Sequence, residues 1–298
     1  MCPVISAIVA TYNAPDLLYK TLVSLRDQSL KSNVYEVIII DDGSTDHTLD
    51  MLKEFCTLHT HFQWYTQKNK GPAVARNLGI RHARGKYIAI TDHDCIADRD
   101  WLCAVCDIFD QDQEVLGIEG LTASNPEAIH LFTHQVVNYS GGMFATCNVA
   151  YRTDILNQIG GFDEDYPYGH EDTDLSLRVR QLGNIRFSPE AKIIHPPIPI
   201  SFEKLVKQAN QLVLNEFILF KKQPNWYNQY HRSPLHTLLV ELCFKMFFHL
   251  LRINLKYVYR SPIMYVKYCL AIFLQRMYLL YLLAKMYWKN QIPVYIAE

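Results

Sequence analysis

Four short apolar runs alternate with three helix-forming segments over the first 90 residues of this chain. The runs have the length and composition of buried strands, and they comprise Val4–Ala10, Tyr35–Ile40, Phe62–Thr66 and Lys86–Ile90. The segments between them show helical spacing or a glycine-led helix start, and they comprise Asp16–Gln28, Asp46–Thr57 and Pro72–Ala83. Because strands alternate with helices, we predict an α/β fold with a doubly wound, mostly parallel sheet flanked by helices.

Polar residues stand where three of these strands are predicted to end. Tyr12 follows the first strand, Asp42 the second, and Asp92 with Asp94 the fourth. Ligands of doubly wound sheets bind beyond the carboxyl ends of the strands. We therefore expect these three separate segments to meet at one crevice.

The pattern becomes less regular after Asp98. Further helices are expected at 101–109, 154–159 and 171–182, and further strands at 115–121, 142–151 and 192–194. Three prolines at positions 196, 197 and 199 then interrupt regular structure. We expect one domain over residues 1–198 and a basic, amphipathic helical extension over residues 199–298.

The two regions carry opposite charge. Residues 1–200 hold 16 Lys and Arg against 26 Asp and Glu, a net charge of −10, whereas residues 201–298 hold 13 against 4, a net charge of +9. The first region suits cations, and the second suits an anionic partner. The overall charge of −1 argues against a general nucleic-acid-binding protein.

Two C-terminal stretches bear on membrane contact. Between residues 235 and 259, charged residues recur every three or four positions on an otherwise apolar segment: Glu241, Lys245, His249, Arg252 and Lys256. Such a stripe fits an in-plane membrane helix and equally a helix packed on the catalytic domain or a partner subunit. Ile263–Trp288 is long enough to span a bilayer, but Arg276 near its centre favours peripheral association.

Targeting and cysteine usage indicate the compartment. No secretory signal precedes the first strand, and we expect the chain in the cytoplasm, or attached peripherally to the inner face of the membrane. The eight cysteines are then expected to be free thiols. Cys103 and Cys106 form a single CxxC pair, which alone does not indicate a zinc site.

Asp92 and Asp94 are candidate metal ligands. They lie two residues apart at a predicted strand end, so extended backbone sends both carboxylates to one side. Paired carboxylates that meet a diphosphate suit Mg²⁺ or Mn²⁺, and the nearby Asp42 favours this interpretation over a solvated turn. His195 follows the last predicted strand, where a lone histidine is more often structural than a ligand.

Two predicted helix starts also carry charge. Glu171 and Asp172 open a helix, where acidic side chains either cap the helix or act as a general base on a hydroxyl. These residues alone leave both interpretations open. Gly71 leads a helix that carries Arg76, a combination suited to anions but without P-loop or dinucleotide-binding spacing.

Together these segments resemble glycosyltransferase family 2, the inverting enzymes with the GT-A fold, over about residues 1–197. The resemblance rests on six motifs in the family's order and approximate spacing: Ile8–Asn13, Ile39–Asp46, Gly71–Gly79, Asp92–Asp94, Gly160–Glu164 and His170–Leu175. Residues 1–198 would then form a nucleotide-sugar-dependent catalytic domain. No core motif departs from the family pattern in a way that marks an inactive copy.

The resemblance implies a donor site. Thr11, Tyr12, Asn13 and Asp42 would hold the base and ribose of a nucleotide-sugar, with Tyr12 packed on the base. Arg76 would lie beside them, and UDP is the favoured nucleotide.

The resemblance also implies a metal site and a catalytic base. Asp92 would face the ribose or the metal, Asp94 would bind the metal, and His195 would complete the site, which reverses the structural interpretation of that histidine. The metal would be Mn²⁺ or Mg²⁺. Asp172 would be the general base, with Glu171 beside it touching donor or acceptor.

The expected activity is a metal-dependent, inverting sugar transfer from a nucleoside-diphosphate sugar to a hydroxyl in surface glycan or glycolipid synthesis. The acceptor would be a glycan or a lipid-linked molecule, and an anionic membrane surface would be a further partner. Two alternatives stay open: a catalytically inactive, membrane-associated nucleotide-sugar sensor or scaffold, and a sugar nucleotidyltransferase. No motif in the sequence sets the donor sugar, the acceptor, the linkage or the oligomeric state.

Overall fold

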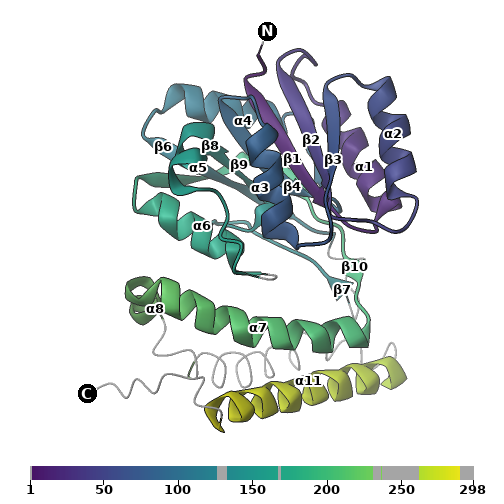
Figure 1. Ribbon diagram of the computed structural model, residues 1–298, viewed down its shortest axis with the longest axis vertical. Helices are drawn as coiled ribbons and strands as arrows, with labels where there is room; N and C mark the ends of the chain where they lie inside the picture. Colours follow the sequence, from purple (N-terminus) through teal and green to yellow (C-terminus); the bar gives the residue numbers. More distant parts are fainter. Residues whose placement is uncertain (1, 126–132, 167–168, 231–235, 237–261, 289–298) are drawn as a thin grey trace. The chain divides into compact units, whose positions relative to one another are not determined.

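A computed structural model describes residues 2–125, 133–166, 169–230, 236 and 262–288 (Figure 1). By its contacts the chain divides into two compact units. The first comprises Met1–Ala128 and Gln135–Pro197, and the second comprises Ile129–His134 and Ile198–Glu298. The roles assigned from the sequence to residues 1–198 and 199–298 stay predictions.

An eight-stranded sheet forms the centre of the first unit. Its strands are β1 (Ile5–Thr11), β2 (Tyr35–Asp41), β3 (Phe62–Thr66), β4 (Tyr87–Asp92), β5 (Ile96–Ala97), β6 (Val115–Ala123), β8 (Val149–Arg152) and β9 (Asn184–Ile194). Their spatial order is β3-β2-β1-β4-β8-β6-β9-β5. The first four strands of this order are parallel, as are β6 and β9, whereas β8 and β5 run antiparallel to their neighbours. The predicted mostly parallel sheet is confirmed.

Helices cover both faces of this sheet. They are α1 (Pro15–Arg26), α2 (Thr48–Leu58), α3 (Pro72–His82), α4 (Trp101–Gln111), α5 (Thr153–Ile159) and α6 (Glu171–Arg180). Successive side chains of a strand point to opposite faces. In β1, Ile5 and Val9 therefore lie in a buried cluster with α1, α2 and α4, whereas Ile8 lies in a second cluster with α3, α5 and α6. This two-sided burial explains why the strands read as continuous apolar runs.

The strand predicted over residues 142–151 is shorter in the structure. It begins only at Val149, after a short 3₁₀ helix over Thr146–Asn148. The backbone amides of residues 142–144 donate instead to the carboxylate of Glu119, a buried side chain of β6. Because those donors are already used, this segment cannot pair as a strand.

Of two other strands, β9 is longer than the sequence predicts, and β5 is not predicted from the sequence at all. β9 begins at Asn184 rather than at residue 192, and its first half alternates between exposed and half-buried side chains. That half contains Pro189, a residue that weakens a strand pattern. β5 has only two residues, and it exists because Ile96 pairs with Ile194 of β9.

The second unit is mainly helical where it is described. It contains the antiparallel pair β7 (Thr133–His134) and β10 (Ile198–Pro199), and the helices α7 (Phe202–Lys222), α8 (Pro224–Tyr230) and α11 (Pro262–Trp288). α7 contacts both α8 and α11. The Tyr227 hydroxyl of α8 donates to Glu216 of α7 at 2.7 Å in a buried contact.

Two expectations for this region meet different outcomes. The helix expected over Ile263–Trp288 is confirmed as α11. The charged stripe expected between residues 235 and 259 lies outside the described residues, apart from His236. Within the described ranges, no helix combines the length and the apolar character needed to cross a membrane.

Candidate functional site

The carboxyl ends of β1, β2 and β4 lie side by side. Their parallel register aligns Thr11 with Asp41, and Ala10 with Asp92. The three segments that follow these strands therefore start at one edge of the sheet, which is where ligands of such sheets bind.

Asp42 is buried in the loop after β2 and holds the segment that leads into α3. Its Oδ1 accepts hydrogen bonds from the Gln67 side chain at 2.8 Å and from the Lys70 amide at 2.9 Å. Its Oδ2 accepts one from the Gly71 amide at 2.9 Å. Because a carboxylate oxygen can accept two hydrogen bonds, Oδ2 keeps the capacity for one further donor.

The residues at the end of β1 differ in their environment. Tyr12 presents an exposed ring, with 44% of the residue accessible. Asn13 has φ +48° and ties the strand end to the loop after β2, since its amide donates to Ser44 Oγ and its Oδ1 accepts from the Thr45 amide, both at 2.8 Å. Thr11 is buried, and its Oγ1 has no hydrogen-bond partner among the described residues.

Arg76 of α3 joins two other elements through its guanidinium. Nη2 donates to Asp92 Oδ1 at 2.8 Å at the end of β4, and Nη1 donates to Glu171 Oε1 at 2.9 Å at the start of α6. Burial acts to lower the pKa of Arg76, but the charges of Asp92 and Glu171 outweigh it and raise the pKa above its usual range. In the same way, Arg76 lowers the pKa of Asp92 against the effect of burial. Arg76 and Asp92 therefore both favour their charged forms.

Asp172 follows Glu171 in the first turn of α6. Burial raises the pKa of Asp172 to about 6, and the negative charge of Glu171 acts in the same direction. Its Oδ1 accepts a hydrogen bond from the Thr173 amide at 2.7 Å. A carboxylate with this pKa is ionised at neutral pH and is a stronger base than an ordinary aspartate, so it is suited to accept a proton.

The two carboxylate oxygens of Glu171 differ in their hydrogen bonding. Oε1 binds Arg76, whereas Oε2 is buried and has no hydrogen-bond partner among the residues that the structure describes. A buried polar atom without a partner costs stability, which points to a role in binding. The side chain of His170 at the N-cap position makes no cap hydrogen bond, and the first-turn amide of Thr173 donates to Asp172 instead.

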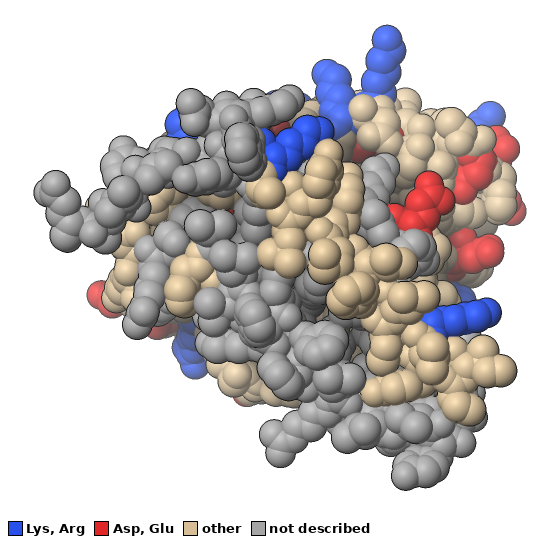
Figure 2. Space-filling view, turned by 90° about the horizontal axis from the view of Figure 1, so that it is seen from below, with Lys and Arg blue, Asp and Glu red and all other residues tan. Residues whose placement is uncertain are grey.

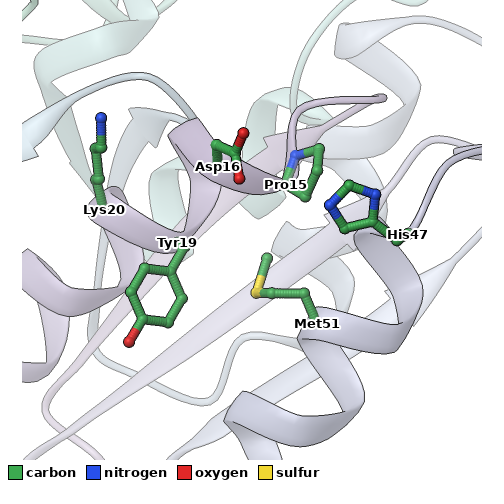
Figure 3. A pocket seen from close by; sticks show the side chains of 6 residues that line it. All are labelled: Pro15, Asp16, Tyr19, Lys20, His47 and Met51. Carbon is green, nitrogen blue, oxygen red and sulfur yellow. The ribbon is translucent and has the colours of Figure 1, made fainter.

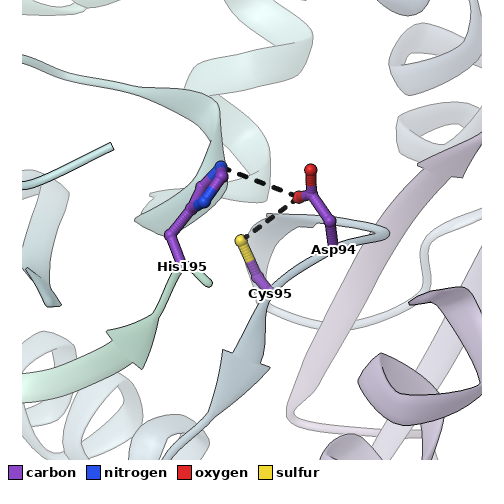
Figure 4. A group of neighbouring side chains, drawn as sticks. All are labelled: Asp94, Cys95 and His195. Atoms are coloured by element: carbon purple, nitrogen blue, oxygen red, sulfur yellow. Dashed lines mark hydrogen bonds and ion pairs between the residues drawn. The ribbon is translucent and has the colours of Figure 1, made fainter. Parts of the chain in front are cut away.

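A second cluster contains Asp94, Cys95 and His195 (Figure 4). Asp94 Oδ1 lies 3.7 Å from Cys95 Sγ and 3.8 Å from His195 Nε2. His195 Nδ1 lies 3.0 Å from the Pro196 carbonyl oxygen, which favours the tautomer with its proton on Nδ1 and the Nε2 lone pair toward Asp94. One ligand atom of each residue lies within 4.8 Å of the others. Carboxylate, imidazole and thiol are a donor set that fits a divalent cation.

The structure thus separates the two aspartates that the sequence pairs. Asp94 lies with His195, whereas the Oδ1 of Asp92 is engaged by Arg76. The metal role of Asp92 stays a prediction.

Sequence reasoning missed two features of this region. The sequence alone does not mark Cys95 as a ligand, although this residue directly follows Asp94 in the chain. Asn77 was also missed: its side chain donates to the Phe162 carbonyl and to Glu164, both at 2.9 Å, which attaches the Gly160–Glu164 motif to α3. The sequence does contain a signal for this contact, because Gly160–Glu164 is one of the six motifs that carry the family resemblance.

A separate, shallow cavity of about 470 Å³ lies beside the first turns of α1 and α2 (Figure 3). Its lining residues are Pro15, Asp16, Tyr19, Lys20, His47 and Met51. No predicted site residue lines it.

Comparison with known proteins gives one family. The model of "Glycosyl transferase family 2" matches residues 6–160. An uncharacterized glycosyltransferase of Rickettsia bellii is 29% identical over 165 residues, which are 54% of this chain and 23% of that protein. The Escherichia coli protein named UDP-Glc:alpha-D-GlcNAc-diphosphoundecaprenol beta-1,3-glucosyltransferase WfaP is 29% identical over 232 residues, 70% of this chain and 85% of WfaP. The chain spans about a quarter of the length of the Rickettsia relatives.

Solved glycosyltransferase structures share the fold. The mannosyltransferase PcManGT from Pyrobaculum calidifontis, in complex with GDP-Man and Mn²⁺, has a TM-score of 0.65 and 19% identity, and the match covers 97% of this chain and 88% of PcManGT. Residues 1–349 of Staphylococcus aureus TarS in complex with UDP-GlcNAc give a TM-score of 0.59 and 18% identity, covering 79% of this chain and 75% of that one. The fold class predicted from the sequence is confirmed.

Proposed function

Because this chain belongs to glycosyltransferase family 2 and has the GT-A fold, we propose that it transfers a sugar from a nucleoside-diphosphate sugar to an acceptor hydroxyl. The observation that carries this proposal is the buried Arg76, which bridges Asp92 and Glu171. The bridge links the end of β4 to the helix that begins with Glu171 and Asp172. Sugar transfer needs these two functions together: a cationic group for the departing diphosphate and a base for the attacking hydroxyl.

The donor would bind at the ends of β1 and β2. The exposed Tyr12 ring offers a stacking surface for a base, and the unpartnered Thr11 hydroxyl and Asp42 Oδ2 offer polar contacts to base or ribose. Asn13 would hold the loop after β1 against the loop after β2. UDP is the favoured nucleotide, which agrees with the donor named for WfaP and the ligand named for TarS, whereas PcManGT is named with GDP-Man.

Asp94 and His195 would hold a divalent cation, Mn²⁺ or Mg²⁺, and Asp92 would face the ribose or the metal. When bound, such an ion would neutralise the charge that develops on the departing diphosphate. The buried Arg76 would supply fixed positive charge to the same leaving group from α3.

Asp172 would remove the proton from the acceptor hydroxyl, which then attacks the anomeric carbon from the face opposite the diphosphate and inverts that centre. Its raised pKa supports this role, since the base must be ionised before the hydroxyl arrives and basic enough to take its proton. Glu171 would orient donor or acceptor through its uncommitted Oε2.

Activity should therefore depend on pH through Asp172. The base is protonated below its pKa of about 6 and ionised above it, so kcat/KM should rise with pH through about 6 and then level off. Initial rates between pH 4.5 and 8.5 at saturating metal measure this profile. A rate that is flat through pH 6, or that falls as pH rises through it, would contradict the role of Asp172.

The acceptor would be a surface glycan or a lipid-linked molecule, with an anionic membrane as a further partner. α11 carries exposed apolar side chains every three or four positions: Ile263, Val266, Leu270, Phe273, Leu274, Met277 and Tyr281. The exposed Lys267 and Lys285 are 18 residues apart, five full helical turns, and so share one edge of this face. An apolar face with a cationic edge fits a helix that lies on an anionic lipid surface, and the net charge of +9 over residues 201–298 supports it.

Neutralising that edge should weaken binding to lipid. Each lysine near an anionic surface contributes about 1 kcal/mol, so the Lys267→Gln/Lys285→Gln variant should bind vesicles of phosphatidylserine and phosphatidylcholine roughly 30-fold more weakly at low salt. Co-sedimentation of the full-length chain measures this, with Lys31→Gln of the first unit as the matched control. Wild-type protein that stays in the supernatant would contradict membrane association. Self-association at rising protein concentration would then favour the partner-subunit interpretation of the C-terminal region.

The donor site is tested by calorimetric titration with UDP, GDP and dTDP, each with Mn²⁺ and again with EDTA. Metal-dependent binding of one nucleotide is the expected result, and it would name the donor class. Binding by none of the three would contradict the proposed site at Asp42, Asp92 and Asp94. A nucleotidyltransferase would be recognised by pyrophosphate as product, and a sensor by binding without turnover.

A further inference from the structure

The residue directly after Asp94 has the position and chemistry of a metal ligand. We propose that Cys95 supplies a sulfur ligand to the cation site of Asp94 and His195, so that the site binds thiophilic cations such as Co²⁺ and Zn²⁺ more tightly than Mg²⁺. The inference rests on the proposed function, because it concerns the cation of the same site.

The backbone places Cys95 and His195 opposite each other. β5 and β9 are antiparallel, with Ile96 paired to Ile194 and Ala97 paired to Ile193. One residue further along this register, Cys95 lies across from His195. The Cys95 amide also donates to the Asp92 carbonyl at 3.3 Å, which closes a tight turn over residues 92–95 and fixes the position of Asp94.

The side chains converge on one point. Cys95 Sγ and His195 Nε2 lie 3.7 and 3.8 Å from the same oxygen, Asp94 Oδ1. Figure 4 shows both side chains directed toward that carboxylate. Ligand atoms around one cation are about 3–4 Å apart, because metal bonds to N, O and S are about 2.0–2.3 Å long. The three ligand atoms lie within 4.8 Å of one another, so shifts of less than about 1 Å would complete the site.

The burial of the group fits three protein ligands with one open side. Cys95 and His195 are buried, and the Asp94 side chain is 16% exposed. The protein would thus supply three ligands and leave a position for the donor diphosphate, as catalytic metal sites do. Binding would replace the Cys95 S–H bond with a sulfur–metal bond and release the thiol proton to solvent.

The donor set determines which cations bind well. Mg²⁺ prefers oxygen ligands only, whereas imidazole and thiolate favour Co²⁺ and Zn²⁺. Mn²⁺ would rank between these groups. Without Cys95, the site would keep its oxygen and nitrogen ligands. It would then lose affinity for soft cations such as Co²⁺ and Zn²⁺ but not for Mg²⁺.

Cobalt reports the sulfur ligand directly. Titration of the full-length protein with Co²⁺ should produce the near-ultraviolet charge-transfer absorption of a sulfur–cobalt bond. The absorption should disappear in Cys95→Ser and persist in Cys103→Ser, a matched control on α4. Loss of a partner that only orients a ligand costs about 10–100-fold in metal affinity, so Cys95→Ser should cost at least that for Co²⁺ and Zn²⁺. Its Mg²⁺ affinity should change less than about threefold.

Two results would overturn the assignment of Cys95 as a sulfur ligand. Co²⁺ binding without the sulfur absorption in the wild type would overturn it, whatever the variants do, and would leave the proposed function intact. An equal loss of affinity for Mg²⁺ and Co²⁺ in Cys95→Ser would also overturn it, because a merely packed cysteine would act on both alike. Failure of the nucleotide titration with Mn²⁺ is a separate result and would count against the proposed function.

Discussion

An Asp172→Asn variant will lose about 10²–10⁴-fold in kcat while its affinity for the donor nucleotide changes little. Asparagine has the shape of the aspartate and can keep the hydrogen bond from the Thr173 amide, but it cannot accept a proton from the acceptor. The effect should therefore fall on the chemical step. Steady-state kinetics together with the nucleotide titration separate kcat from binding.

The stability of the folded Asp172→Asn variant is the control, because it shows whether a loss of kcat comes from a damaged fold. The folded protein holds the pKa of Asp172 at about 6, above its ordinary value, so the folded state binds more protons between about pH 4 and 6 and loses stability as pH rises through that window. Asparagine removes this loss, and the variant should be no less stable than wild type at pH 8. Asp154→Asn, an exposed position of α5, should leave both properties unchanged. A kcat within threefold of wild type for Asp172→Asn would contradict its assignment as the base.

An Arg76→Gln variant will lower the free energy of unfolding by about 3–5 kcal/mol at pH 7. Arg76 bonds Asp92 and Glu171 with a side chain that is 6% exposed, and its loss leaves both carboxylates without their cation. Removing one partner of a buried ion pair costs far more than the pair itself contributes. Urea unfolding monitored by circular dichroism measures the difference.

An exposed ion pair supplies the comparison for Arg76. Arg26 bonds Asp27 at 2.8 Å, but the two side chains are 36% and 59% exposed, so Arg26→Gln should cost less than about 1 kcal/mol. If Arg76→Gln is no more destabilising than Arg26→Gln, the buried bonds from Arg76 to Asp92 and Glu171 do not stabilise the fold as we expect. The Arg76→Gln variant should also lose activity, because its guanidinium would act on the leaving diphosphate.

The sequence predicts the parts of the fold that local pattern controls. β1, β2 and β4 are buried on both faces, so their apolar runs stand out, and the residues that follow them must lie at one edge of the sheet. The donor-site candidates Tyr12 and Asp42 could be chosen on that basis. Their assignment to base and ribose came from the resemblance to a family and stays a prediction.

The parts that the sequence could not predict depend on contacts between distant residues. β8 is short because Glu119 binds the amides of residues 142–144, and nothing local to either segment indicates that bond. The grouping of Cys95 with His195, 100 residues later, follows from the two-residue strand β5, which is too short to give a pattern of its own. Arg76 was expected beside the donor site, but its bond to Glu171 required the packing of α3 and α6 to be known.

The central claim is sugar transfer, and product analysis of the full-length protein tests it most directly. The protein is incubated with the nucleotide-sugars of the class found by titration, with Mn²⁺ and with lipid-linked or glycan acceptors, and the released nucleotide is identified by chromatography. Asp172-dependent release of the nucleoside diphosphate, with an inverted anomeric centre in the product, is the result that we predict. Release of pyrophosphate, or nucleotide binding without any release, would contradict the claim.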